Sequence, residues 1–212
     1  MLATGLVALA VSAPQTAGAQ SDTGFAVAGH GILVATGSAD LEVRVDVDDD
    51  LGMFEIPSPE DLRVSGGVGG RFEILPVPQF STGLQVSYAR QRTSEETDHS
   101  WRDVDLWLAA RLPAEVGARG VSVVPYVAAP VGLSILVGRL PSSSDERRLG
   151  WNLSALLGVE VEATKGFALY LEGGWLMRQA RSSGDSAFGD YRLTFTTHQF
   201  VLHLGLRGSR SR

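Results

Sequence analysis

The sequence predicts an all-β protein, an eight-stranded antiparallel up-and-down transmembrane β-barrel with short periplasmic turns and long extracellular loops. Three observations lead to this prediction. Apolar and polar residues alternate with a period of two along several stretches, as in strands with two different faces. The connections between these stretches alternate between short and long. The polar faces are rich in Gly, Ser and Ala and contain no Lys, unlike the exterior of a soluble protein.

Composition limits the function classes. The chain has 212 residues, enough for one large β domain, and its formal net charge of −6 argues against general nucleic-acid binding. Cysteine is absent, which excludes disulfides and thiolate metal sites. An apolar core near the start is followed by Ala17 and Ala19 in the pattern of a signal-peptidase site before Gln20. We therefore expect an exported protein, with a signal peptide at 1–19 and an outer-membrane barrel domain at 20–212.

Eight stretches carry the strand pattern, and a tilted strand needs about 9–11 residues to span a membrane. They are Phe25–Val34, Arg63–Leu75, Phe80–Gln91, Trp101–Leu112, Val121–Val137, Gly150–Glu162, Phe167–Arg178 and Tyr191–Arg207. The short links PVPQ, PAEVGARG and ATKG alternate with long polar links such as RTSEETDHS and GRLPSSSDERRL. This sorting of loops by length is the layout of an outer-membrane barrel, and it places both termini on the short-turn side.

Two of the expected strands are irregular. Pro125 and Pro130 fall inside the fifth, where a closed barrel has no edge to accommodate them, so we expect a bulge or a later start. The last strand loses its alternation beyond Thr196. Its first half would turn Leu193 and Phe195 outward, which also predicts a bulge.

The orientation of the faces separates a soluble barrel from a membrane barrel. In FALYLEGGWLMR one register is apolar, and the other contains Glu172 and Arg178. A soluble barrel would turn the apolar register inward, and a membrane barrel would turn it outward. Aromatic residues gather at strand ends, with Phe72, Phe80 and Phe167 at the short-turn end and Tyr88, Trp151 and Trp175 at the other. Such girdles mark the two lipid–water interfaces, so we expect Glu172 to point into the lumen.

The chain resembles small bacterial outer-membrane β-barrel proteins of the OmpA/OmpW-like, porin-family type. The resemblance covers residues 25–207 and rests on the phrases VPYVAAPVGLSIL, GWNLSALLGVEVEA and LYLEGGWL. It implies a location in the outer membrane of a Gram-negative cell. The implied partners are outer-membrane lipid, lipopolysaccharide, the outer-membrane assembly machinery and an extracellular ligand at the long loops. It implies no nucleic acid and no cofactor.

Charged residues on the inward faces form the main candidate site. They are Arg71, Glu73, Arg111, Glu160, Glu162, Glu172 and Arg207. Desolvated charges must be paired, which predicts a buried ion-pair network in the lumen. The network either fills the lumen or forms a proton or ion path. Filling is favoured because eight-stranded barrels are generally occupied by their own side chains.

Two other motifs are weaker. The loop DVDDDLG, Asp46 to Asp50, offers carboxylates for a hard cation, but Leu51 and Pro57 break the EF-hand pattern, which favours a solvated acidic loop. His99 and Ser100 lie beside Asp98, three residue types that a lipid hydrolase needs in mutual reach. We treat this as coincidence and expect no enzyme, no catalytic residue and no metal.

The expected function is therefore that of an integral outer-membrane barrel with a structural or surface-interaction role and no wide pore. One alternative is transport of small hydrophobic solutes across the outer membrane. A second alternative is a secreted lipocalin-like binding protein, which would hold a hydrophobic ligand in an apolar cavity.

Overall fold

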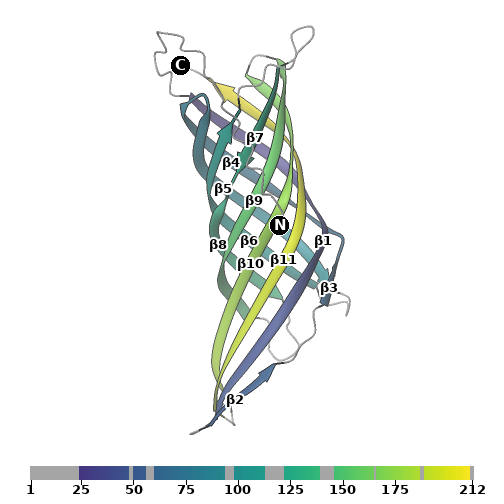
Figure 1. Ribbon diagram of the computed structural model, residues 1–212, viewed down its shortest axis with the longest axis vertical. Coiled ribbons are helices and arrows are strands. Elements are labelled where there is room, and N and C mark those ends of the chain that lie inside the picture. Colours follow the sequence, from purple (N-terminus) through teal and green to yellow (C-terminus); the bar gives the residue numbers. More distant parts are fainter. Residues whose placement is uncertain are drawn as a thin grey trace, which may run out of the picture.

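The antiparallel strands form one closed barrel (Figure 1). The ring has eight strand positions. The strands are β1 (Gly24–Val47), β4 (Ser65–Val77), β5 (Phe80–Thr93), β6 (Asp98–Arg111), β7 (Ser122–Ala128), β8 (Val131–Gly138), β9 (Glu146–Thr164), β10 (Phe167–Ser186) and β11 (Gly189–Arg210). β7 and β8 share one position, because both pair with β6 and β9. Pairing of β1 with β11, from Phe25–Arg210 to Asp46–Asp190, closes the ring. The predicted eight-stranded barrel is confirmed.

The structure, a computed structural model, describes residues 24–47, 50–55, 60–93, 98–112, 122–138, 146–164, 166–186 and 189–210. The predicted signal peptide, 1–19, lies outside these residues. No helix in the described part is long and apolar enough to cross a membrane.

The two ends of the barrel differ. At the short-turn end Pro78 and Gln79 turn β4 into β5, and Gly166, at a φ of 81°, turns β9 into β10. A positive φ of this size favours glycine. At the other end β1, β10 and β11 continue beyond their predicted limits, and the short strands β2 (Asp50–Glu55) and β3 (Glu60–Arg63) pair with β1. In Figure 1 β2 lies at the lower end, and β3 lies above it on the right.

The fifth barrel strand is divided into β7 and β8 at Ala129 and Pro130, where the prolines had predicted a bulge or a later start. Proline has no N–H to donate to a neighbouring strand. The carbonyl of Pro130 still accepts a hydrogen bond from Ser154 N at 2.9 Å, and Ala129 N donates to Leu108 O at 2.8 Å. Pro125 stays within β7, opposite Val159. The break therefore interrupts the strand without opening the ring.

The predicted bulge in the last strand is wrong. Leu193 and Phe195 point inward and are 2% and 4% exposed, so β11 keeps one alternation throughout. The irregularity lies in the partner strand, where the register of β1 shifts between Val34 and Thr36. The physical reason is that Leu193 and Phe195 lie inside the lumen, where they pack in a buried apolar cluster with Trp101.

The outer face is apolar and the lumen is polar. Leu157 on β9 is 70% exposed, whereas Glu172 on β10 is 1% exposed. Other exposed large apolar residues come from all parts of the ring, such as Val68 of β4, Leu84 of β5 and Leu204 of β11. A lipocalin-like binder requires the opposite arrangement, so that alternative is excluded.

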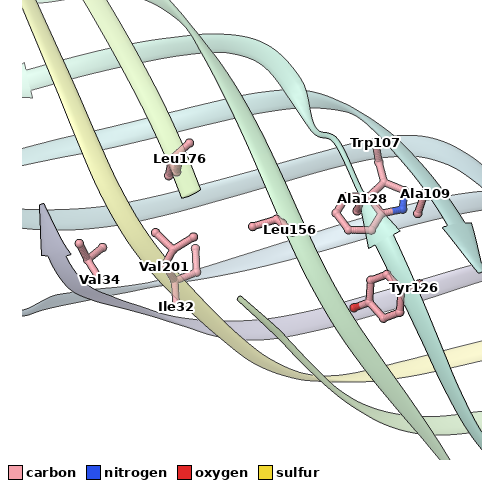
Figure 2. Close-up of a cluster of buried hydrophobic side chains, with 9 residues drawn as sticks. All are labelled: Ile32, Val34, Trp107, Ala109, Tyr126, Ala128, Leu156, Leu176 and Val201. Atoms are coloured by element: carbon pink, nitrogen blue, oxygen red, sulfur yellow. The ribbon is translucent and has the colours of Figure 1, made fainter. Parts of the chain in front are cut away.

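Two apolar clusters lie inside the barrel. Figure 2 shows the first, Ile32 and Val34 of β1, Trp107 and Ala109 of β6, Tyr126 and Ala128 of β7, Leu156 of β9, Leu176 of β10 and Val201 of β11. The second, nearer the long-loop end, contains Ala39, Leu62, Trp101, Leu136, Ala180, Leu193 and Phe195. Both are built from inward positions of strands whose outward positions are also apolar.

Leu157→Arg should destabilise the barrel by roughly 2–4 kcal/mol in lipid, the cost of a cation near the bilayer midplane. The measurement is urea unfolding of the protein folded into vesicles. Leu157→Ala is the matched control and should cost much less, since it adds no charge. Equal stability of the Arg variant and the wild type, in vesicles and in detergent, would contradict the outward orientation.

Candidate functional site: the charged lumen

Glu73 on β4 is the centre of a buried ion-pair network near the short-turn end. Its carboxylate accepts hydrogen bonds from Arg71 Nε at 2.8 Å and from Arg111 Nη2 at 2.8 Å, and Arg207 Nε lies 3.4 Å from it. Arg111 Nη2 also donates to Glu160 Oε1 at 3.1 Å, and Arg207 Nη1 lies 3.5 Å from Glu160 Oε2. One carboxylate thus connects arginines from three strands.

Glu172 on β10 extends this network across the lumen. Arg71 Nη1 lies 3.2 Å and 3.3 Å from its two oxygens, the Tyr126 hydroxyl donates to Oε2 at 2.5 Å, and His203 Nδ1 lies 2.8 Å from Oε1. The network joins three arginines to three glutamates, so its formal charges balance. Balance matters because an unpaired charge in a desolvated lumen costs several kcal/mol.

Aromatic rings hold the central guanidinium in place. Arg71 Cζ lies 3.6 Å from the ring centroid of Trp107 and 4.9 Å from that of Tyr170. At these distances the cation–π attraction stabilises the guanidinium group in addition to its ion pairs. A Cβ at Gly205 would collide with the Tyr170 ring, so the glycine leaves the room that this ring occupies.

Two histidines continue the network toward β1. The rings of His30 and His203 stack with centroids 4.8 Å apart and an interplanar angle of 12°. His30 Nδ1 lies 2.7 Å from the Tyr170 hydroxyl. Sequence reasoning did not place the histidines in the site, although both occupy inward registers of their strands.

The structure brings together most of the predicted lumen charges. Arg71, Glu73, Arg111, Glu160, Glu172 and Arg207 all belong to the network. Glu162 does not, and this part of the prediction is corrected: its side chain is exposed, and it accepts a hydrogen bond from Gly166 N at 3.2 Å. Alternation directs Glu162 inward, but the residue lines a hollow of about 350 Å³ at the short-turn mouth of the barrel, within reach of water.

A second polar network lies nearer the long-loop end. Asp103 of β6 accepts hydrogen bonds from Arg178 Nη2 at 2.7 Å, from Ser134 Oγ at 2.7 Å and from Ser87 Oγ at 3.0 Å. Arg178 Nη1 also donates to Gln199 Oε1 at 3.0 Å. Sequence reasoning turned Asp103 and Arg178 inward but did not pair them. Their opposite charges on inward registers are the signal that could have predicted the pair. The two residues are 75 positions apart, so the sequence does not show that they meet.

Side chains fill the lumen in alternating layers. The inward residues of β10 pass from Glu172 in the first network through Leu176 in the first apolar cluster to Arg178 in the second network and Ala180 in the second cluster. Ions would have to cross two desolvated apolar layers and two sets of paired charges. The arrangement suits a closed lumen.

The residues predicted to form girdles lie on the outer face. Phe72, Phe80, Phe167, Trp151 and Trp175 are 39–47% exposed, and Tyr88 is half-buried. Trp151 Nε1 donates to Gln179 Oε1 at 3.2 Å, and Trp175 stacks on His198 at a centroid distance of 5.7 Å. A ring with an apolar body and a polar partner is typical of a lipid–water interface.

The weaker motifs form no reactive site in the described part of the chain. His99 is buried in the lumen, whereas Ser100 faces outward and donates to Val137 O at 3.3 Å. Successive residues of a strand point to opposite faces, so these two do not form a dyad. The side chain of Asp98 and the carboxylates of Asp46 to Asp50 lie outside the described residues. Among described side chains, no group of three or more His, Asp or Glu could hold a metal.

Comparison with known proteins bears on the fold. No family model and no curated protein matches the sequence. The outer membrane protein OprG from Pseudomonas aeruginosa superposes with a TM-score of 0.60 at 12% identity, over 91% of this chain and 97% of that one. The outer membrane protein AlkL gives a TM-score of 0.50 at 11% identity, over 87% and 91% of the two chains. This chain has the fold of the small eight-stranded outer-membrane β-barrel proteins.

The surface and the fold of this barrel bear on its location. The outer face carries an apolar band between two aromatic girdles, and the charged groups of the same strands are turned into the lumen. A closed ring also satisfies the backbone hydrogen bonds that lipid cannot supply. These features fit a barrel that spans a membrane, and its fold is shared with bacterial outer-membrane proteins.

Glu73→Gln should destabilise the barrel by about 3–5 kcal/mol, because it leaves three buried guanidinium groups short of one carboxylate. Glu162→Gln is the matched control and should change stability little, since this carboxylate is exposed and outside the network. Urea unfolding in vesicles, followed by tryptophan fluorescence, measures both. Equal effects of the two substitutions would contradict the assignment of Glu73 as the centre of the network.

Proposed function

We propose that this protein is a closed, non-enzymatic outer-membrane barrel with a structural or surface-interaction role. The observation that carries the proposal is the layered lumen, in which two networks of paired charges alternate with two apolar clusters. The separation of His99 from Ser100 on opposite faces supports the absence of enzymatic turnover.

The long strands support a role at the cell surface. β1, β10 and β11 have 24, 20 and 22 residues, about twice the 9–11 that a tilted strand needs to cross the bilayer. Their continuation, with β2 paired to β1, forms a sheet beyond the long-loop girdle. Such a sheet offers a rigid surface for contacts outside the membrane.

Conductance across planar bilayers tests the closed lumen. The refolded protein should show no stable large conductance steps, and Glu172→Gln should show none either, because the Asp103–Arg178 layer and both apolar clusters remain. A wide porin in the same bilayers is the positive control. Stable large steps of the wild type would refute the closed lumen, and small steps changed by Glu172→Gln would favour an ion path instead.

One observation favours the second candidate, transport of small hydrophobic solutes. An apolar hollow of about 650 Å³ lies on the lipid-facing wall beside the strand break at Ala129, and its lining includes Ala110, Ala155, Gly173 and Phe200. The small side chains make the wall thin there, and a hollow of this size accommodates a small apolar molecule.

If this second function holds, filling the hollow should abolish it. Ala155→Phe should slow the uptake of a small apolar fluorescent dye into vesicles that contain the protein, back to the rate of protein-free vesicles. Val159→Phe, an outward position of the same strand that does not line the hollow, is the control. A wild-type rate equal to that of empty vesicles would reject transport and leave the surface role.

A further inference from the structure

The outer face of β10 and β11 changes its chemistry beyond the long-loop girdle. Along β10 the outward residues pass from Leu171 through Trp175 to Gln179 and Arg181, and along β11 the outward series ends in Arg192. Trp175 and Arg181 are separated by about 20 Å along the strand, at roughly 3.3 Å per residue. The arginines therefore lie beyond the acyl chains, at a level where lipid headgroups surround the barrel.

Three arginines line one hollow on this face. The hollow has a volume of about 440 Å³ and is lined by Arg44 of β1, Arg181 of β10 and Arg192 of β11. Arg44 and Arg192 are direct cross-strand partners. The partner of Arg192 on β10 is Ser183, so Arg181, two residues before Ser183 on the same face, is a diagonal neighbour of Arg192. Like charges directly opposite each other destabilise a strand pair, so this arrangement requires a counter-charge.

Among the described side chains that line the hollow, one carboxylate faces three guanidinium groups. Glu42 is the carboxylate that lines the hollow, and it pairs with Arg44 at 2.6 Å. Within the described part of the chain, Arg181 and Arg192 have no carboxylate partner. Polar side chains complete the lining, namely Gln179, Ser182, Ser183 and Thr194. The hollow thus combines guanidinium groups with neutral hydrogen-bonding groups, the donors that a phosphate needs.

We propose that this hollow binds a phosphate on the headgroup of lipopolysaccharide in the outer leaflet. Three features of the hollow favour this ligand. The hollow lies beyond the long-loop girdle, its described lining has an excess of positive charge, and it opens on the outer face of the barrel. Arginine recognises phosphate through two parallel hydrogen bonds, so Arg181 and Arg192 are the principal ligands.

Native mass spectrometry of the protein refolded in non-ionic detergent tests the proposal, with bis-phosphorylated lipid A as the probe. Wild type should retain it, and Arg181→Gln/Arg192→Gln should weaken binding about tenfold or more, since each bond to a charged group contributes strongly. The matched control, Arg102→Gln/Arg147→Gln, removes two exposed outward arginines that do not line the hollow, and it should bind as wild type does. The heat-modifiable band on a gel verifies that each variant is folded.

Five results would overturn the proposal. Equal weakening by both double variants would show a general charge effect, and unchanged binding by Arg181→Gln/Arg192→Gln would remove the site. Equal retention of dephosphorylated lipid A would exclude phosphate recognition. Competition by inorganic phosphate at the same concentration as lipid A would assign the hollow to a soluble anion. A wild type that retains no lipid A would show that the hollow binds no lipid phosphate.

Discussion

The buried pairing of three arginines with three glutamates is the interaction on which the barrel depends. A closed ring of strands satisfies its backbone internally, so its remaining requirement is a lumen with no unpaired charge. Glu73 and Glu172 meet this requirement by accepting from arginines on different strands, and Arg71 is held between them by Trp107. Removing one partner would leave the others desolvated and unpaired, which explains why small changes here are expected to affect the whole molecule.

Space in the lumen is matched to this pairing. A Cβ at Gly158 would collide with the ring of Tyr126, just as one at Gly205 would collide with that of Tyr170. Both tyrosines reach the charged network, since Tyr126 donates to Glu172 and Tyr170 lies beneath Arg71. Glycines on one strand thus accommodate rings from another, which fits the closed lumen that we propose. The proposed contacts with other molecules would then be made at the surface, through the apolar hollow, the arginine hollow and the extended strands.

Features that depend on the alternation of a single strand were predictable from the sequence. Features that depend on the depth of a residue in the lumen, or on which strands pair, were not. Glu162 has the inward alternation of its strand, but alternation says nothing about distance from the mouth, and the residue is exposed. The apolar character of Leu193 and Phe195 predicted a lipid-facing position, but both side chains pack in an apolar cluster inside the lumen. The irregularity inferred for β11 belongs to β1, because a register shift is a property of a strand pair, and one strand's residues cannot show which partner holds the extra residue.

The sequence by itself determined the class of fold, the number of barrel strands, the two faces of most strands and six charged residues of the network near the short-turn end. These follow from a period of two and from loop length, which are local properties of the chain. Only the tertiary structure decided which charges meet. The stagger of the strands brings Arg178 to Asp103 and sets Arg44 opposite Arg192, and that stagger is fixed when the ring closes rather than by any one strand.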